Sequence, residues 1–331
     1  MTNFKEDILV SVNCLTYNHE KYIAKTLDSI LMQKTNFKFE VLIHDDASSD
    51  NTKKIIEQYQ NKFPDIIKPI FQYENKYSKG IKRIGYIYNH KRANGKYIAW
   101  CEGDDYWIDE NKLQKQIDYM EKNNKCTLIF HNAERIDDLT GESMGYMINK
   151  EWENSEFNVE EIFKYGFIPT ASVIYRKLAL DNPPDWYFDA ITGDLATNLI
   201  VANFGYIYYM KDVMSVYRVG NVNSMMNQWK LNNTSIDSRI KHQLGFINLF
   251  NNFDDFSNHK YSDQISNVKK DFEFELFRLQ GKISELKDKK YKDKYSKLTL
   301  MDKLKIYLLK YAPKLFGEFS KIKLEILKKV K

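Results

Sequence analysis

The sequence predicts an α/β fold in which a mostly parallel sheet is flanked by helices and is followed by a C-terminal helical extension. Two observations support this prediction. Over the first 135 residues, short apolar runs typical of buried strands alternate with segments of helical apolar spacing. From about residue 221 onward, the pattern changes to long polar helices. We therefore expect one domain at residues 1–220 and a helical region at residues 221–331.

The alternation in the first part of the chain places the expected elements in order. The run ILVSVNCL is typical of a buried parallel strand, and the residues after it have the apolar spacing of a helix. Ser49 or Asp50 is a natural N-cap for the next helix. Strands are expected at residues 8–15, 39–44, 66–73, 97–101 and 127–131, and helices at residues 22–31, 51–59, 84–93 and 111–123.

Periodicity is weaker over residues 137–166, which indicates a longer connection. After it, we expect strands at residues 168–175, 207–210 and 213–217, and a short helix at residues 194–203. Long helices are expected at residues 236–250, 264–287, 298–311 and 313–331.

The composition excludes several classes of protein. The chain has 331 residues, of which 29% are charged, 13 are Gly and 6 are Pro, so neither a disordered nor a fibrous protein fits. Three scattered cysteines indicate no disulfide framework and no zinc site. No uncharged apolar run approaches the ~18–20 residues of a membrane span, and the N-terminus leads directly into a strand. We therefore expect a cytoplasmic protein without a secretory signal.

Charge is distributed unevenly along the chain. Residues 281–331 contain 16 Lys and 6 Asp or Glu, whereas the whole chain has a net charge of only +5. The preceding part is therefore mildly acidic, which argues against a nucleic-acid partner. Within the tail, apolar residues recur every three or four positions from Leu315 to Val330. Such a helix could pack on the body or on a second subunit of a homodimer, or contact the inner face of the cell membrane peripherally.

Three acidic clusters follow expected strands or open an expected helix: Asp45-Asp46, Glu102-Gly103-Asp104-Asp105, and Asp194. The carboxyl ends of parallel strands meet at one edge of a sheet, so the first two clusters should converge. Glu102 and Asp104 offer oxygen ligands suited to Mg²⁺ or Mn²⁺, with phosphate oxygens completing the shell. A metal held by so few carboxylates indicates a phosphorylated ligand.

No P-loop and no dinucleotide-binding glycine motif follows the first strand. That strand ends instead in Leu15-Thr16-Tyr17-Asn18, where an aromatic ring and an amide could cover and fix a base. Asp46 could accept a hydrogen bond from an imide N–H, such as that of uracil.

The runs VSVNCLTYN, VLIHDDASSDNT and NGKYIAWCEGDDYWIDENKLQKQ together resemble the family 2 inverting glycosyltransferases of the GT-A (Rossmann-like) fold. The resemblance covers roughly residues 8–220 and is strongest to bacterial members that assemble capsular, lipopolysaccharide or other surface glycans. It implies transfer of a hexosyl or N-acetylhexosaminyl group from a nucleotide-diphosphate donor, with UDP expected. The acceptor would be a hydroxyl of a glycan or a lipid-linked molecule, and the anomeric configuration would be inverted.

The resemblance also implies roles for individual residues. Asp104 would bind the metal, with Glu102 in the first position of the family's D-x-D motif, where the family has Asp. Asp194 would be the general base, although a helix N-cap is its alternative role. The remaining implied contacts are Leu15, Tyr17 and Asp46 with the base, Lys82 or Arg83 with the base or diphosphate, and Asp105 with the outer shell of the metal or the acceptor.

Four further side chains lie near the expected site, and two of them, Arg218 and His131, have two interpretations each. Arg218 could neutralise the diphosphate or pair with a carboxylate. Trp107 is expected to stack on a sugar, whereas Trp100 is expected in the core. His131 falls where the acceptor is expected but is more typical of a buried, hydrogen-bonded histidine.

Two other functions remain open at this point. A sugar nucleotidyltransferase also combines an α/β sheet, a nucleotide and carboxylate-bound Mg²⁺, but it would need a Gly-, Arg- and Lys-rich phosphate loop that Ser11–Asn18 lacks. A non-catalytic glycan-binding protein on the same fold is the other alternative, because Glu102 departs from the family motif.

Overall fold

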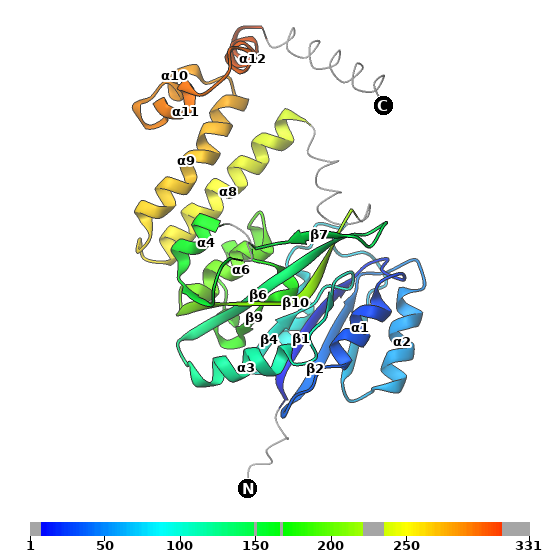
Figure 1. The fold of residues 1–331 in the computed structure, drawn as a ribbon. Helices are drawn as coiled ribbons and strands as arrows, with labels where there is room; N and C mark the ends of the chain where they lie inside the picture. Colours follow the sequence, from blue (N-terminus) through cyan, green and yellow to red (C-terminus); the bar gives the residue numbers. More distant parts are fainter. Residues whose placement is uncertain (1–7, 149–150, 166–167, 221–234, 313–331) are drawn as a thin grey trace. The chain divides into compact units, whose positions relative to one another are not determined.

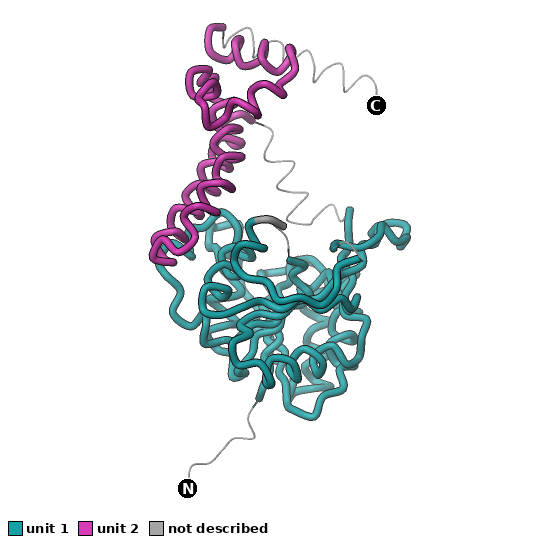
Figure 2. The backbone as a smooth tube through the Cα atoms, turned by 60° about the vertical axis from the view of Figure 1, so that its left-hand side comes forward, with its two compact units in different colours: residues 1–224 teal, residues 225–331 magenta. Residues whose placement is uncertain are grey.

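The computed structural model describes residues 8–148, 151–165, 168–220 and 235–312. The chain divides into two compact units, residues 1–224 and 225–331 (Figure 2). This division falls four residues after the boundary expected from the sequence. The expected amphipathic helix at residues 313–331 lies outside the described residues.

The first unit is built on a mixed sheet with helices beside it (Figure 1). Its described strands are β1 (Ile8–Thr16), β2 (Lys38–Asp45), β3 (Ile67–Phe71), β4 (Tyr97–Trp100), β5 (Tyr106–Trp107), β6 (Cys126–Asp137), β7 (Ser143–Tyr146), β8 (Ser155–Phe157), β9 (Ile174–Arg176) and β10 (Tyr206–Val219). Its described α-helices are α1 (Ile23–Leu31), α2 (Thr52–Lys62), α3 (Lys112–Lys122), α4 (Val159–Tyr165), α5 (Trp186–Asp189) and α6 (Gly193–Ala202).

Strand order in the sheet is β3-β2-β1-β4-β9-β6-β10-β5. The first four strands in this order run parallel to one another, and β6 is parallel to β10. Strand β9 lies antiparallel between β4 and β6, so the sheet is mixed. From β1 the chain continues to β2 and β3 on one side and later returns to β4 on the other. The carboxyl ends of β1 and β4 therefore form a topological switch point, where ligands bind in open α/β sheets.

The core of this unit is explained by the local sequence. Continuous runs of residues in β1 and β2 are buried, because these parallel strands are covered on both faces of the sheet. Helix α1 buries Ile23, Leu27 and Ile30, which lie on one face because they are spaced four and three residues apart. Helices α1 and α2 lie side by side (Figure 1).

Several elements differ from the sequence prediction. Residues 85–92 form a short π-helix and a 3₁₀ turn rather than an α-helix. The strand expected at residues 168–175 shortens to β9, because Pro169 precedes a 3₁₀ turn at Thr170–Ser172. The two strands expected after residue 206 are one strand, β10, with register irregularities between Met210 and Val213 that explain the apparent break. Residues 137–166 contain β7, β8 and α4.

The second unit is helical. It contains α8 (Ile236–Phe256), α9 (Ser262–Leu279), α10 (Ile283–Leu286), α11 (Lys292–Ser296) and α12 (Leu300–Tyr311). The helix expected at residues 264–287 is interrupted at Gly281, whose φ of 65° favours glycine. Helices α8 and α9 pack through stacked aromatic rings. The ring centroids of Phe246 and Phe272 lie 4.7 Å apart. None of the helices in the described residues combines the length and apolar composition that a membrane span requires.

Candidate functional site

Main-chain hydrogen bonds at the end of β1 draw two of the acidic clusters together. The N–H of Gly103 donates to the Leu15 carbonyl at 2.8 Å. The N–H of Asp46 donates to the Thr16 carbonyl at 3.0 Å. The loop after β4 and the turn after β2 therefore meet at the end of β1, on the edge of the sheet that the parallel topology predicts.

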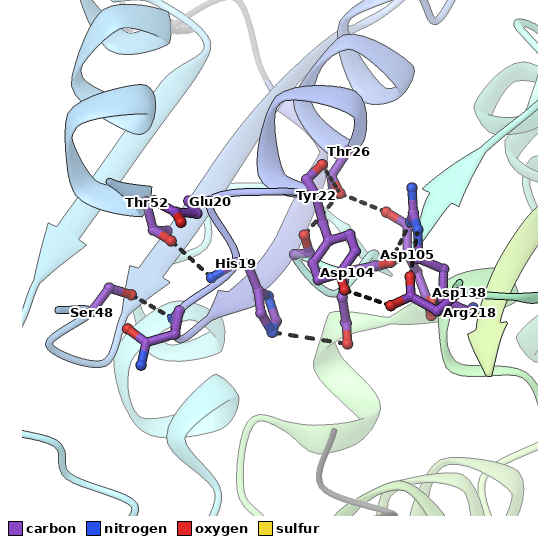
Figure 3. A network of polar contacts seen from close by, with 12 residues as sticks. His19, Glu20, Tyr22, Thr26, Ser48, Thr52, Asp104, Asp105, Asp138 and Arg218 are labelled. Carbon is purple, nitrogen blue, oxygen red and sulfur yellow. Dashed lines mark hydrogen bonds and ion pairs between the residues drawn. The ribbon is translucent and has the colours of Figure 1, made fainter. Parts of the chain in front are cut away.

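The segment after β1 is further tied to the turn before α2 (Figure 3). The N–H of Asn18 donates to Ser48 Oγ at 2.9 Å, and the N–H of His19 donates to Thr52 Oγ1 at 2.8 Å. Asn18 and Ala47 have φ angles of 55° and 63°, which are uncommon for residues other than glycine. Such local strain persists only where surrounding bonds enforce it, and it concentrates at binding and catalytic sites.

Asp46 supports a neighbouring loop in addition to its expected role. Its two carboxylate oxygens accept the N–H groups of Lys76 at 2.7 Å and Tyr77 at 3.0 Å. Each oxygen keeps one lone pair, so a base N–H can still bind there. Beside it, Leu15 is half-buried and the Tyr17 ring is 45% exposed, which leaves an apolar edge and an aromatic face at the end of β1.

Arg218 of β10 holds the loop that contains Asp104 (Figure 3). Its guanidinium lies between two tyrosine rings, 5.0 Å from the centroid of Tyr22 and 4.6 Å from that of Tyr106. Nη1 donates to the Asp104 carbonyl, and Nε lies 3.7 Å from Oδ1 of Asp138. The Tyr22 hydroxyl donates to Oδ2 of Asp138 at 2.6 Å. Arg218 thus has the second of its two expected roles, pairing with a carboxylate.

Asp105 points into the protein. Its carboxylate is buried and accepts the main-chain N–H of Arg218 at 3.4 Å. The Thr26 hydroxyl is shared between the carbonyls of Gly103 and Asp105, at 3.0 and 2.7 Å. The Asp105 carboxylate therefore ties the loop to β10, and its expected contact with the outer metal shell or the acceptor stays a prediction.

Negative charge accumulates in this loop, and the charges affect the pKa values of its carboxyl groups. Burial, together with the charges of Asp104 and Asp194, raises the pKa of Glu102. Burial and the neighbouring Asp104 and Glu102 likewise raise the pKa of Asp105, against the lowering effect of Arg218. Asp194, of the third acidic cluster, is thus among the charges that raise the pKa of Glu102, although 92 positions separate the two residues in the sequence.

Asp194 lies in the first turn of α6, with its side chain exposed. The segment that leads into this helix is fixed by Arg83, whose φ is 57°. Its guanidinium donates to the carbonyls of Tyr187, Ala190 and Thr192. Arg83 was expected to bind the base or diphosphate. In the structure these bonds make it the support of the segment that presents Asp194.

The expected sugar contact of Trp107 is not supported by the structure. The Trp107 side chain is only 1% exposed, and its Nε1 donates to the Ala171 carbonyl at 2.9 Å. It is buried because β5 pairs with β10, which turns the ring into the core. Trp100, expected in the core, is only half-buried. His131 is fully buried and hydrogen-bonded to the Asn132 carbonyl, the second of its two interpretations.

Tyr22, Asp138 and His19 also contact this site, although the sequence motifs do not predict it. The hydrogen bond between Tyr22 and Asp138 spans 116 positions and leaves no local pattern. His19 lies shortly after the first strand, in the run Tyr17-Asn18-His19. Its position at the carboxyl end of a parallel strand could have indicated a place in the site. Its Nε2 lies 3.9 Å from Oδ2 of Asp104.

The chemistry of the donor set fits a hard divalent cation. Asp104 and Glu102 supply carboxylate oxygens whose mutual repulsion a cation would relieve. Within the described ranges, no three His, Cys, Asp or Glu side chains form a ready metal cage. Mg²⁺ typically uses one or two carboxylates plus substrate phosphates, so these two groups are sufficient. Nearby, Thr16 Oγ1 and His19 Nδ1 are buried and have no hydrogen-bond partner among the described residues.

Comparisons with known proteins agree on one family. The family model "Glycosyl transferase family 2" matches residues 11–181. An uncharacterized protein of Mycobacterium tuberculosis (strain H37Rv) is 33% identical over 223 residues, which are 63% of this chain and 58% of that relative. The chain thus aligns with little more than half of that relative's length.

Two relatives have more informative names. The UDP-Glc:alpha-D-GlcNAc-diphosphoundecaprenol beta-1,3-glucosyltransferase WfgD of Escherichia coli is 36% identical over 132 residues, 40% of this chain and 48% of that protein. The putative teichuronic acid biosynthesis glycosyltransferase TuaG of Bacillus subtilis is 29% identical over 241 residues, 70% of this chain and 86% of that protein.

Solved structures show the same fold. TarS (residues 1–349) of S. aureus in complex with UDP superposes with a TM-score of 0.53 at 18% identity, covering 83% of this chain and 79% of that one. The same protein with UDP-GlcNAc gives a TM-score of 0.54 at 15% identity, covering 92% and 87%. The first unit accordingly has the GT-A architecture expected from the sequence.

Proposed function

The chain belongs to glycosyl transferase family 2, and on this premise we propose that it transfers a sugar from a nucleotide-diphosphate donor to a hydroxyl group. The donor is a UDP-sugar carrying a hexose or N-acetylhexosamine, and the acceptor is a glycan or lipid-linked molecule of bacterial surface polysaccharide synthesis. Two comparisons support these choices. The name of WfgD specifies a UDP-sugar and a diphosphoundecaprenol acceptor, and TarS was solved with UDP and UDP-GlcNAc.

The observation on which the proposal depends is the convergence of the acidic clusters. The Glu102–Asp105 loop and the Asp45–Asp46 turn are bonded to the same end of β1, and Asp194 acts on Glu102 electrostatically. Sugar transfer from a nucleotide donor needs three features around one point: a site for the base, a site for the metal and a proton acceptor. One residue or cluster alone would be explained equally well by helix capping.

Donor binding follows from the end of β1. Leu15 and Tyr17 offer contacts to the base, and Asp46 can accept its imide N–H. Asp104 and Glu102 would hold Mn²⁺ or Mg²⁺. When bound, the cation would supply Lewis-acid stabilisation of the charge that develops on the leaving diphosphate. Arg218 keeps the Asp104 loop in place through its main-chain carbonyl.

Proton transfer is assigned to Asp194. Its exposed carboxylate, in the first turn of α6, can take the proton from the acceptor hydroxyl as the oxygen attacks the anomeric carbon. Attack from the face opposite to the diphosphate inverts the configuration. General-base catalysis of this kind contributes roughly 10²–10⁴ in rate. Arg83 supports this step by fixing the segment before α6.

The first experiment measures donor binding. A panel of UDP-, GDP- and dTDP-sugars is screened for thermal stabilisation of the full chain, with and without Mn²⁺ or Mg²⁺. We expect a UDP-sugar to stabilise the protein most, and only with the metal. Asp104→Asn should abolish the metal-dependent stabilisation, because it removes the charged ligand. Stabilisation that is independent of metal and unchanged in Asp104→Asn would contradict the assigned site.

The second experiment measures transfer as release of UDP in the presence of a panel of sugar acceptors. Asp194→Asn should keep donor binding within about twofold and lose transfer by roughly 10²–10⁴. Asp189→Asn, an exposed carboxylate five positions earlier, is the matched control and should retain activity. Pyrophosphate released from a triphosphate would favour the nucleotidyltransferase alternative. Donor binding without any UDP release by the unsubstituted chain would favour a non-catalytic protein.

A further inference from the structure

Helix α12 (Leu300–Tyr311) of the second unit has two apolar faces. Ile306 is buried and packs with Ile283 and Leu286 of α10 in a small core. This inner face fixes the helix within its unit. The apolar residues on the other side of the helix are not used by that core.

The outer face of α12 consists of Leu300, Leu304, Tyr307 and Tyr311. Their spacing of four, three and four residues places them in one row along the helix, over about 16 Å. All four are exposed, and the exposed fraction reaches 86% for Leu300 and 54% for Leu304. Met301, beside this row, is also exposed. A continuous apolar row of this kind on a protein surface marks an interaction site.

Lysines border one side of the outer face. By helical spacing, Lys303 and Lys310 lie along one edge of the row, whereas Lys305 lies farther around the helix on the other side. Only Lys305 has a carboxylate of this helix near it, with its Nζ 3.8 Å from Oδ1 of Asp302. Over residues 281–312 the chain has ten Lys and four Asp or Glu, so the surroundings are basic as well.

Charge argues against two possible occupants of this face and favours a third. A second copy bound symmetrically would bring the same lysines against each other, which is unfavourable. Residues 313–331 contain six Lys and two Glu, so this segment would also bring positive charge to a positive border. A surface of anionic lipid headgroups is complementary to the lysines, and it accepts leucine and tyrosine side chains at the level of the headgroups.

We propose that the outer face of α12 docks on an anionic lipid surface. The two leucines and two tyrosines enter the interface between headgroups and acyl chains. The long stems of Lys303 and Lys310 extend from the edge of the apolar row and bring their ammonium groups to the lipid phosphates, and Lys305 adds to the positive charge around the row. This attachment is independent of the donor site, and it would keep the enzyme at the surface where a lipid-linked acceptor is found.

The test is cosedimentation of the full chain with lipid vesicles. One set is pure phosphatidylcholine, and in the other about a third of the lipid is phosphatidylglycerol. We expect binding to the anionic vesicles only, weakening as salt is added. Leu304→Asp combined with Tyr307→Ser should lower the affinity at least about tenfold, because it places a charge in the apolar row. Each lysine changed to glutamine should lower it about fivefold.

Leu139→Asp is the matched control, since Leu139 is 90% exposed but belongs to the first unit. It should bind vesicles like the unsubstituted chain. The proposal is wrong if the unsubstituted chain ignores anionic vesicles, or if the α12 double variant binds them normally. It is also wrong if the unsubstituted chain is a dimer in solution and the double variant is a monomer. Nucleotide-sugar binding, measured on the same variants, should be unchanged, so the two proposals fail separately.

Discussion

Replacing Arg218 by methionine tests how the Asp104 loop is held. Methionine keeps an apolar stem between the rings of Tyr22 and Tyr106 and removes the guanidinium. The variant loses the bond to the Asp104 carbonyl and the ion pair with Asp138, whose carboxylate is 11% exposed. The Asp138 carboxylate would keep only the Tyr22 hydroxyl as a partner among the described residues.

The magnitude follows from the burial of this pair. Removing one partner of a buried ion pair costs about 3–5 kcal/mol, because the other charge is left uncompensated. For a unit of this size, that is a decrease in Tm of roughly 6–20 °C. Donor affinity should fall about 10–100-fold, the usual effect of removing a group that orients a ligand-binding residue. Adding Asp138→Asn to the variant should restore part of the stability, at least ~1 kcal/mol, because no unpaired charge remains.

Arg176→Met is the matched control. Arg176 is also partly buried, and its guanidinium donates to the carbonyls of Cys126 and Met120 at 2.8 and 2.6 Å. These contacts lie in α3 and at the start of β6, whereas Asp138 follows the end of β6. Urea unfolding and calorimetric titration with the donor are measured for both variants. If Arg218→Met loses stability but binds the donor as well as Arg176→Met does, Arg218 does not position the loop and the reasoning is refuted.

Two further predictions concern Gly103 and Lys112. A Cβ at Gly103 would lie 2.8 Å from His19 Nδ1 and 3.0 Å from Thr16 Oγ1, so Gly103→Ala should displace the loop and weaken donor binding about tenfold or more. Unchanged affinity in a titration would contradict this. Burial lowers the pKa of Lys112 from 10.5 to about 7. Between pH 7 and pH 10.5, the unfolded chain therefore holds this proton while the folded chain does not. The free energy of unfolding should rise with pH in this window, by up to ~1.4 kcal/mol per pH unit. Lys112→Met should flatten that rise in urea unfolding measured across the window, and equal slopes would contradict the assignment.

Local sequence patterns were sufficient for most elements of the GT-A core. The apolar runs at β1 and β2 and the spacing of Ile23, Leu27 and Ile30 in α1 are properties of short segments, so they are visible without the fold. The meeting of the turn after β2 with the loop after β4 was predictable for a different reason. Parallel strands end at one edge of a sheet, so their order in the chain predicts which loops lie together.

Side-chain orientation was less predictable. Trp107 and Trp100 are aromatic residues close to the same loop, and their sequence gives no indication of which is buried. Pairing of β5 with β10 buries Trp107. The direction of β9 was also unpredictable, because a short apolar run fits a parallel and an antiparallel neighbour equally well.

By itself, the sequence determined most of the parallel strands, the acidic clusters that follow them and the family, because these depend on residues close together in the chain. Only the tertiary structure decided how the site is held. The contacts of Arg218 with Asp138 and Tyr22 join residues far apart in sequence, and so do those of Arg83 with the segment before Asp194. Whether a buried charge is paired depends on which distant groups the fold brings beside it, and no local pattern contains that information.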